Sequence, residues 1–315
     1  GDTLITGGAR GKDDAYIYDP KANLWSGVEG APKLAEAHWI RSFVDAQGRV
    51  RDLSGVVADI TAETLTPEGL ARLAAVKAES LPLVENPGRI APPWRGVGKF
   101  IAIGLNYSDH AAETGAPVPK EPIVFMKATS CIVGCNDPVV LPQGSVKSDW
   151  EVELGVAIGR KARYVSEAEA LQYVAGYCVV NDVSEREYQL ERGPQWDKGK
   201  GCDTFGPVGP WLVTRDEVPD PQALGMRLEV NGKRFQNGSS KTMIFGVAHL
   251  VSYLSRFMTL YPGDLITTGT PPGVGMGVKP APVFLKPGDV ITLGIDGLGS
   301  QRQAVHAWDP ALIDG

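Results

Sequence analysis

Cysteine is scarce in this chain, with only four residues among 315. Cys131, Cys135, Cys178 and Cys202 show no CxxC spacing, so the sequence favours neither a disulfide framework nor a zinc site. A cysteine without such a partner usually packs as a small apolar side chain. We therefore expect buried free thiols.

Long apolar runs and a basic surplus are missing as well. No stretch approaches the roughly 20 apolar residues that cross a bilayer, and no charged-then-apolar leader opens the sequence. The net charge is −6 at pH 7, whereas nucleic acid or an anionic membrane would require positive charge. We expect a cytoplasmic protein with neither a nucleic acid nor a membrane as its partner.

Glycine and proline, in contrast, are abundant, with 38 and 24 residues. The apolar runs between them are mostly short and rich in valine and isoleucine, which is typical of strands. Many short strands with few helices favour a barrel or sandwich over a doubly wound parallel sheet. The sequence therefore predicts a mixed, β-rich α+β fold.

Three parts of the chain differ in pattern. Residues 1–37 resemble one kelch repeat, with a Gly-Gly pair and Trp25, but a propeller requires several such repeats. A fusion segment, an unusual extension and a chance resemblance all remain open there. Residues 38–95 predict a small N-terminal domain, with a hairpin near Gly48 and a helix in "TPEGLARLAAVKA". Residues 96–315 predict a catalytic domain.

Several elements of the third part can be predicted from local pattern. "EVELGVAIG" and "GYCVVNDVS" predict strands, and the capping-box spacing of Ser166 and Glu169 indicates a helix between them. "RLEVNGKRF" predicts a hairpin with an Asn-Gly turn, and the apolar stripe from Val247 to Leu254 predicts a helix. "GDLITTG" and "GDVITLGI" predict two further strands.

Two acidic residues stand inside an otherwise apolar strand. Glu151 and Glu153 are two residues apart, so they point to the same face of that strand. Burying both charges is costly unless a cation or a shared proton compensates, while on an exposed face they would simply be solvated. Asp182 ends the next apolar strand and supplies a third carboxylate. Three carboxylates with open positions suit Mg²⁺ or Mn²⁺.

Six motifs in fixed order resemble the fumarylacetoacetate hydrolase family, in its bacterial acylpyruvase-like branch. The resemblance covers about residues 96–310. The motifs are "GLNYSDHAAE", "FMKA", "DWEVELGVAIG", "NDVSEREYQ", "KGCDTFGP" and "TGTPPGVG". Each motif alone is weak, but all six with suitable spacing are specific. The resemblance implies a β-roll catalytic domain behind a small N-terminal domain.

The same resemblance implies roles for ten residues of this chain. Glu151, Glu153 and Asp182 would hold a divalent metal, and His110 with Glu113 would activate water. Lys200 would have a catalytic role and contact the substrate. The other residues implied to contact the substrate are Lys127, Arg186, Gln189 and Thr270. The chemistry fits these side chains, since histidine is the base best matched to neutral pH and a fixed lysine can stabilise a developing negative charge.

The expected reaction is hydrolysis of the C3–C4 bond of a 2,4-diketo acid, which gives pyruvate and a second acid. Similarity to bacterial sugar-acid enzymes favours a 2,4-diketo-3-deoxy sugar acid, such as a rhamnonate or fuconate derivative, and simple acylpyruvates are an alternative. Oxaloacetate decarboxylation and hydroxymuconate isomerisation also pass through an enolate. His110 and Glu113 favour hydrolysis, because only that reaction needs an activated water.

Two further expectations concern partners. The family resemblance suggests a homodimer. An alternative from another class is a non-catalytic, kelch-like binding protein, for which residues 1–37 would carry the function.

Overall fold

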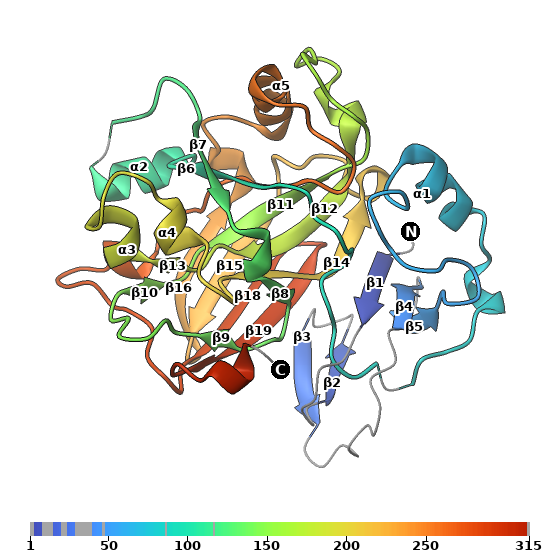
Figure 1. Cartoon of the computed structure of the whole chain (residues 1–315), viewed down its shortest axis with the longest axis horizontal. Coiled ribbons are helices and arrows are strands. Elements are labelled where there is room, and N and C mark those ends of the chain that lie inside the picture. Colours follow the sequence, from blue (N-terminus) through green and yellow to red (C-terminus); the bar gives the residue numbers. More distant parts are fainter. Residues whose placement is uncertain are drawn as a thin grey trace.

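The computed structural model describes residues 3–7, 15–19, 24–28, 40–45, 48–85, 87–115 and 117–313 of the chain. Two large sheets dominate it, and helices lie around their edges (Figure 1). The predicted mixed, β-rich α+β fold is confirmed.

The larger sheet has ten strands and holds the most buried part of the chain. Its order is β5-β4-β1-β14-β12-β11-β17-β6-β7, and β8 pairs with β14. In that order the strands are β5 (Val50–Asp52), β4 (Ile40–Val44), β1 (Thr3–Gly7), β14 (Gly206–Thr214), β12 (Val174–Asn181), β11 (Val152–Ile158), β17 (Leu265–Thr267), β6 (Phe100–Gly104), β7 (Ile123–Lys127) and β8 (Ile132–Gly134). Every residue of β11 and β12 is buried, because both faces of these central strands are covered.

The second sheet has five strands in the order β16-β15-β18-β19-β9. They are β16 (Lys233–Ser239), β15 (Gly225–Val230), β18 (Val290–Ile295), β19 (Gly299–His306) and β9 (Val139–Val140). Gln301 on β19 donates to the carbonyl oxygens of Val179 and Gly209 in the larger sheet, at 2.8 and 2.9 Å. The two sheets are therefore joined by buried hydrogen bonds as well as by apolar packing.

Two small pairs complete the strands. β10 (Ser148–Asp149) pairs with β13 (Ser184–Glu185), directly before β11 and shortly after β12. β2 (Ala15–Asp19) pairs with β3 (Leu24–Val28). The first pair lies beside the acidic residues named above.

The α-helices are short. They are α1 (Pro67–Ala74), α2 (Ser108–Thr114), α3 (Arg186–Leu190), α4 (Asp197–Lys200) and α5 (Val247–Phe257). The 3₁₀ helices are η1 (Ala78–Ser80), η2 (Thr129–Cys131), η3 (Ala170–Tyr173), η4 (Arg215–Glu217), η5 (Ser240–Thr242), η6 (Gly275–Gly277) and η7 (Pro310–Leu312). Figure 1 shows α2, α3 and α4 gathered on one side of the molecule, away from α1.

Most elements predicted from local pattern are present. Thr66 caps α1 by accepting from the Gly69 N–H at 3.1 Å, and β4 pairs with β5 in the predicted hairpin. The turn between β15 and β16 uses positive φ at Asn231 and Gly232, the geometry that an Asn-Gly turn requires. The predicted strands around residues 265 and 290 and the predicted helix α5 are also confirmed.

The helix predicted after Ser166 is wrong. The structure has a turn and the short η3 there, with backbone bonds between residues three apart, such as Gln172 N–H to Glu169 O. The Ser166 hydroxyl donates to the Glu169 carboxylate at 2.6 Å, so the two side chains bind each other instead of capping a helix. Tyr173 O also accepts from Gly159 N–H, which ties the segment directly to the end of β11.

Residues 1–37 lie largely outside the described residues, so the kelch-like resemblance is described only through β1, β2 and β3. Of these, β1 pairs with β4 and β14. The domain boundaries at residues 37 and 95 stay a prediction.

Two expected absences can be compared with the described part of the chain. The four cysteines are free thiols, three of them buried and Cys202 half-buried. No helix within the described ranges is long and apolar enough to cross a membrane.

Candidate active site

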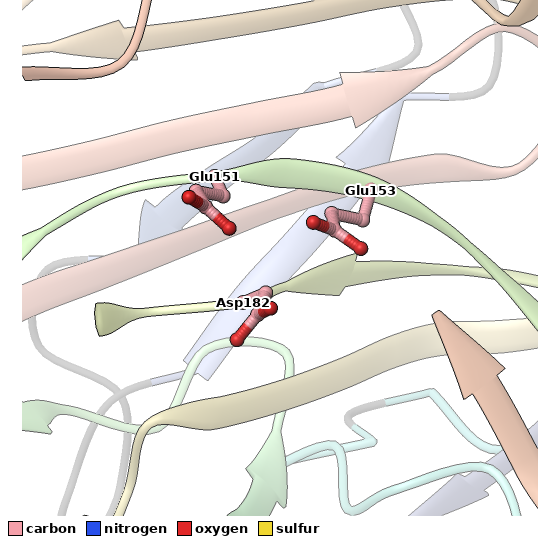
Figure 2. Close-up of side chains that lie close together, drawn as sticks. All are labelled: Glu151, Glu153 and Asp182. Carbon is pink, nitrogen blue, oxygen red and sulfur yellow. The ribbon is translucent and has the colours of Figure 1, made fainter. Parts of the chain in front are cut away.

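Three carboxylates meet where β11 and β12 lie side by side. Glu151 directly precedes β11, Glu153 lies within it, and Asp182 directly follows β12. The Asp182 N–H donates to Glu151 O at 2.9 Å, which fixes the register of the two strands. One ligand oxygen from each side chain lies within 4.8 Å of the others, and Figure 2 shows the three groups converging.

The structure excludes the solvated strand face as an explanation of these acids. Glu151 is 6% exposed, and Glu153 and Asp182 are each 1% exposed. Burial of three carboxylates so close together is strongly unfavourable without positive charge nearby. Something must therefore compensate them.

Lys200, at the end of α4, places its ammonium group between two of the three carboxylates. Its Nζ donates to Glu151 Oε2 at 2.6 Å and to Asp182 Oδ2 at 2.8 Å. Burial acts to lower the pKa of Lys200, but Asp182 and Glu151 outweigh it and raise that pKa. Lys200 is a fixed positive charge at the site.

Lys127, at the end of β7, is a second buried cation. Its Nζ lies 2.7 Å from Asp182 Oδ1, but its N–H groups are directed to the backbone carbonyls of Val183 and Lys200. Asp182 Oδ1 is fully buried and ion-paired with Lys127, but it accepts no hydrogen bond from the described residues. A buried carboxylate oxygen without a hydrogen bond is rare in folded proteins, so this oxygen has room for a further ligand such as an ion.

Arg186, at the start of α3, is the third cation. Its Nη2 lies 2.7 Å from Glu151 Oε1 and 2.8 Å from Asp149 Oδ2, and its Nη1 donates to Gln189 Oε1 at 3.0 Å. The guanidinium thus binds protein groups on each side. For Arg186 and Gln189 to contact a substrate, the substrate would have to bind side chains that already bind protein groups. These two contacts stay a prediction.

The two glutamates of the strand have opposite pKa shifts. Burial acts to raise the pKa of Glu151, but Lys200 and Arg186 outweigh it and hold that pKa at about 2. Burial raises the pKa of Glu153 well above its usual range, and the charges of Asp182 and Glu151 raise it further. Glu153 is therefore the carboxylate that most needs a further cation.

The donor set fits a hard divalent cation. All three ligands are carboxylates, and Mg²⁺ and Mn²⁺ prefer oxygen donors. Around them, the four buried carboxylates of the cluster, with Asp149 included, face three buried cations, which leaves one negative charge uncompensated when all are ionised. The orphaned Asp182 oxygen and this surplus charge both favour a bound cation.

The predicted histidine and glutamate pair forms on α2. His110 Nδ1 lies 3.0 Å from Glu113 Oε2, and His110 is 8% exposed. Glu113 also accepts from the Gly273 N–H, at 3.1 and 3.2 Å to its two oxygens. The carboxylate that orients the imidazole is thus itself held by a loop far along the chain.

Thr270 lies in that loop and is largely buried. Its hydroxyl donates to Val152 O at 2.8 Å and accepts from Gln236 Nε2 at 2.8 Å. The first bond ties the loop to β11, and the second ties it to β16. A substrate contact at this position would therefore come from the loop backbone.

The sequence interpretation missed Asp149 and Gly273. Asp149 is fully buried and binds both Arg186 and the loop that contains Thr270. Its place in "DWEVE", two residues before Glu151, was the available signal. Gly273 gave no signal, because its contact with Glu113 joins residues 160 positions apart.

Comparison with known proteins identifies the family. The pattern described as "Fumarylacetoacetate (FAA) hydrolase C-terminal" matches residues 99–306. A protein of Burkholderia cenocepacia, named provisionally as a hydrolase without a substrate, is 66% identical over 264 residues, which are 84% of this chain and 94% of that protein. The chain belongs to the fumarylacetoacetate hydrolase family of enzymes.

Solved structures share the fold. Fumarylacetoacetate hydrolase from Exiguobacterium antarcticum is 32% identical, with a TM-score of 0.77 over 94% of this chain and 99% of that one. Maleylpyruvate hydrolase from Sphingobium, in complex with manganese(II) and pyruvate, is 28% identical, with a TM-score of 0.71 over 85% and 97%. A 2-hydroxyhepta-2,4-diene-1,7-dioate isomerase from Mycobacterium marinum is 30% identical, with a TM-score of 0.64 over 94% and 100%.

Proposed function

We propose that the protein is a divalent-metal-dependent hydrolase that cleaves the C3–C4 bond of a 2,4-diketo acid. The observation that carries the proposal is the buried cluster of Glu151, Glu153 and Asp182, with an oxygen of Asp182 that accepts no hydrogen bond from the described residues. The manganese(II) and pyruvate in the Sphingobium relative support both the ion and the product.

Glu151, Glu153 and Asp182 would hold Mg²⁺ or Mn²⁺. A bound ion would supply Lewis acidity toward a substrate that chelates it through a carboxylate and a neighbouring ketone. With the ion present, the cluster carries one net positive charge, which matches one substrate carboxylate. Arg186 and Lys127 keep the acidic ligands in place through their ion pairs.

The remaining steps belong to side chains of this chain. His110, oriented by Glu113, takes a proton from water, whose oxygen bonds to C4 of the substrate. Lys200 stabilises the negative charge on the C4 oxygen as a fixed cation. The C3–C4 bond then breaks, its electron pair stays on C3 as a pyruvate enolate, and the proton held by His110 returns to C3. The products are pyruvate and the second acid.

The substrate class is proposed to be 2,4-diketo-3-deoxy sugar acids, with acylpyruvates as the alternative. The lean towards sugar acids rests on the resemblance to bacterial sugar-acid enzymes. We also propose a homodimer as the working assembly, on the same resemblance. Oxaloacetate decarboxylation needs the metal cluster but not the His110–Glu113 pair, so that pair favours hydrolysis.

Isomerisation is the second candidate. The Mycobacterium marinum isomerase shares the fold at 30% identity, so the fold alone accommodates both reactions. The two reactions differ in whether water is consumed. Hydrolysis incorporates one oxygen from water into the second acid, and isomerisation incorporates none.

The test is pyruvate release from a panel of sugar-derived and simple 2,4-diketo acids. EDTA-treated protein is assayed before and after addition of Mg²⁺ or Mn²⁺. Metal-dependent pyruvate with a clear preference within the panel is the expected result and names the substrate class. Metal-loaded protein that releases no pyruvate from any of them, but isomerises a hydroxymuconate, would replace the proposal with the second candidate.

A further inference from the structure

Asp149 is a buried carboxylate for which the proposed reaction has no use. It is completely inaccessible to solvent, at the end of β10. Its Oδ1 accepts from the N–H groups of Trp150 and Gly275, at 2.8 and 2.6 Å. Its Oδ2 accepts from the Met276 N–H at 3.0 Å and from Arg186 Nε at 2.9 Å. A carboxylate so fully bound is placed for a structural or a coupling purpose.

The first partner links Asp149 to the metal cluster. Arg186 Nη2 lies 2.8 Å from Asp149 Oδ2 and 2.7 Å from Glu151 Oε1, so one nitrogen is shared by two carboxylates. Whatever draws Glu151 away from Arg186 leaves the guanidinium to Asp149, and whatever removes Asp149 leaves the guanidinium to Glu151. The two acids share one guanidinium, which binds both at once.

The second partner links Asp149 to the loop of residues 270–277. Gly275 and Met276 direct their N–H groups to Asp149, and two residues earlier Gly273 directs its N–H to Glu113. The Trp150 indole donates to Gly273 O at 3.1 Å and clamps the same point. The loop therefore spans from the neighbour of a metal ligand to the carboxylate that orients His110.

We propose that Asp149 is a positioning residue that couples metal binding at Glu151 to the seating of the 270–277 loop, and through it to Glu113. The inference rests on the proposed function for the identity of the ion. When an ion engages Glu151, Arg186 turns its full charge to Asp149, and the loop is held more firmly. Glu113 is then fixed at its Gly273 contact, so the base is ordered when the ion arrives.

Asp149→Asn is the first test. The amide oxygen can still accept from the Trp150 and Gly275 N–H groups, but the N–H₂ that replaces Oδ2 faces Arg186 and Met276, so the guanidinium stays on Glu151. Because loss of such supporting groups costs about 10- to 100-fold in metal affinity, we expect the dissociation constant for Mn²⁺ to rise by about that factor. Isothermal titration calorimetry measures it without any turnover.

Asp137→Asn is the matched control. Asp137 is also buried, but its partners are the Arg89 side chain and the Gly134 N–H, which belong neither to the metal cluster nor to the 270–277 loop. It should unfold more easily while its Mn²⁺ affinity stays within about twofold of the unaltered protein. A loss of Mn²⁺ affinity equal to that of Asp149→Asn would assign both effects to general destabilisation and overturn the proposal.

Hydrogen exchange on the unaltered chain is the second test and needs no variant to fold. Coupling between two sites is reciprocal, so Mn²⁺ should slow amide exchange across residues 273–276. In Asp149→Asn this slowing should disappear. If Mn²⁺ leaves the amide exchange rates of this segment unchanged in the unaltered chain, the proposal is contradicted.

A double-mutant cycle that combines Asp149→Asn with Glu113→Gln tests whether the coupling runs through the 270–277 loop to Glu113. Glu113→Gln alone should lower Mn²⁺ affinity less than Asp149→Asn does, and its loss of kcat should overlap with that of Asp149→Asn instead of multiplying with it. Fully multiplicative losses would show that the loop carries no coupling. If no diketo acid is hydrolysed, the proposed function fails, while the calorimetry and the exchange data still decide the role of Asp149.

Discussion

Two groups of charged side chains in this protein, one buried and one partly buried, differ in how completely their hydrogen bonds and charges are satisfied. Asp137 and Arg89 form a closed pair, in which both Asp137 oxygens accept bonds from the guanidinium or from a backbone N–H. The cluster around Glu151 has more carboxylates than cations and an Asp182 oxygen that accepts no bond from a described group. In a structural ion pair the positive and negative charges balance, whereas an empty cation site has an excess of negative charge that its ligand neutralises.

The largest effect is expected when the excess negative charge of the cluster is removed by a change at Glu153. Glu153→Gln should abolish measurable Mn²⁺ binding, with at least about a 100-fold rise in the dissociation constant, and bring turnover to background. The same variant should melt at a higher temperature than the metal-free parent, because it removes a buried carboxylate that burial disfavours. Calorimetry and thermal melts check both parts, and unchanged Mn²⁺ affinity would contradict the assignment of Glu153.

Removal of the base separates the cluster from the chemistry. His110→Ala should lower kcat by about 10²- to 10⁴-fold, the usual contribution of a general base. Its Mn²⁺ affinity should stay within about twofold, since the imidazole is bound to Glu113, which is not one of the three proposed metal ligands. Full-rate hydrolysis by this variant would rule out the His110–Glu113 pair as the activator of water.

The pH dependence sharpens the contrast between Glu151 and Glu153. The raised pKa of Glu153 means that an ion binding below that pKa must displace its proton, so Mn²⁺ affinity should fall about tenfold per unit as pH drops below it. Above that pKa the affinity should level off. Titrations in two buffers of different ionisation enthalpy count the released proton, and an affinity independent of pH contradicts the shift.

The same shift has a consequence for stability with a defined sign. The folded, metal-free protein holds a proton on Glu153 that the unfolded chain has already lost above the ordinary glutamate pKa. Metal-free stability should therefore decline as pH rises from the ordinary pKa through the raised one, and added Mn²⁺ should restore it. Melts with EDTA and with Mn²⁺ across that range measure the difference.

The smallest functional effect should come from the closed pair. Asp137→Asn should destabilise the fold by about 1–3 kcal/mol, because it removes the charge of a buried carboxylate that is ion-paired with Arg89. Denaturant unfolding measures this loss. kcat and Mn²⁺ affinity should not change, and a change in either would remove the distinction between the two groups of charge.

Much of the fold was predictable because it follows from short-range pattern. The Asn231-Gly232 turn, the capped helix α1 and the apolar stripe of α5 each depend on residues within a few positions of one another. The helix expected after Ser166 was wrong because long-range contacts outweigh the short-range pattern there. Its spacing was right, but the long-range bonds of Tyr173 to the end of β11 held that segment in a turn.

The carboxylate cluster was predictable from strand alternation together with a strand end, and the family motifs supplied the rest. The sequence could not show that Asp182 keeps an unbonded oxygen, because this depends on where Lys127 directs its N–H groups. It could not show Asp149 as the link between Arg186 and the 270–277 loop either. The bond from the Gly275 N–H to Asp149, for example, joins residues 126 positions apart and forms only when the chain has folded.

The most direct test of the central claim is a crystal structure of the protein soaked with Mn²⁺, with an anomalous difference map at the manganese edge. We expect one strong peak bound by oxygens of Glu151, Glu153 and Asp182 at about 2.0–2.3 Å, with Lys200 displaced from at least one of its two carboxylates. A map without a peak at these three side chains, with Lys200 still bridging Glu151 and Asp182, would contradict the claim that this cluster is a metal site.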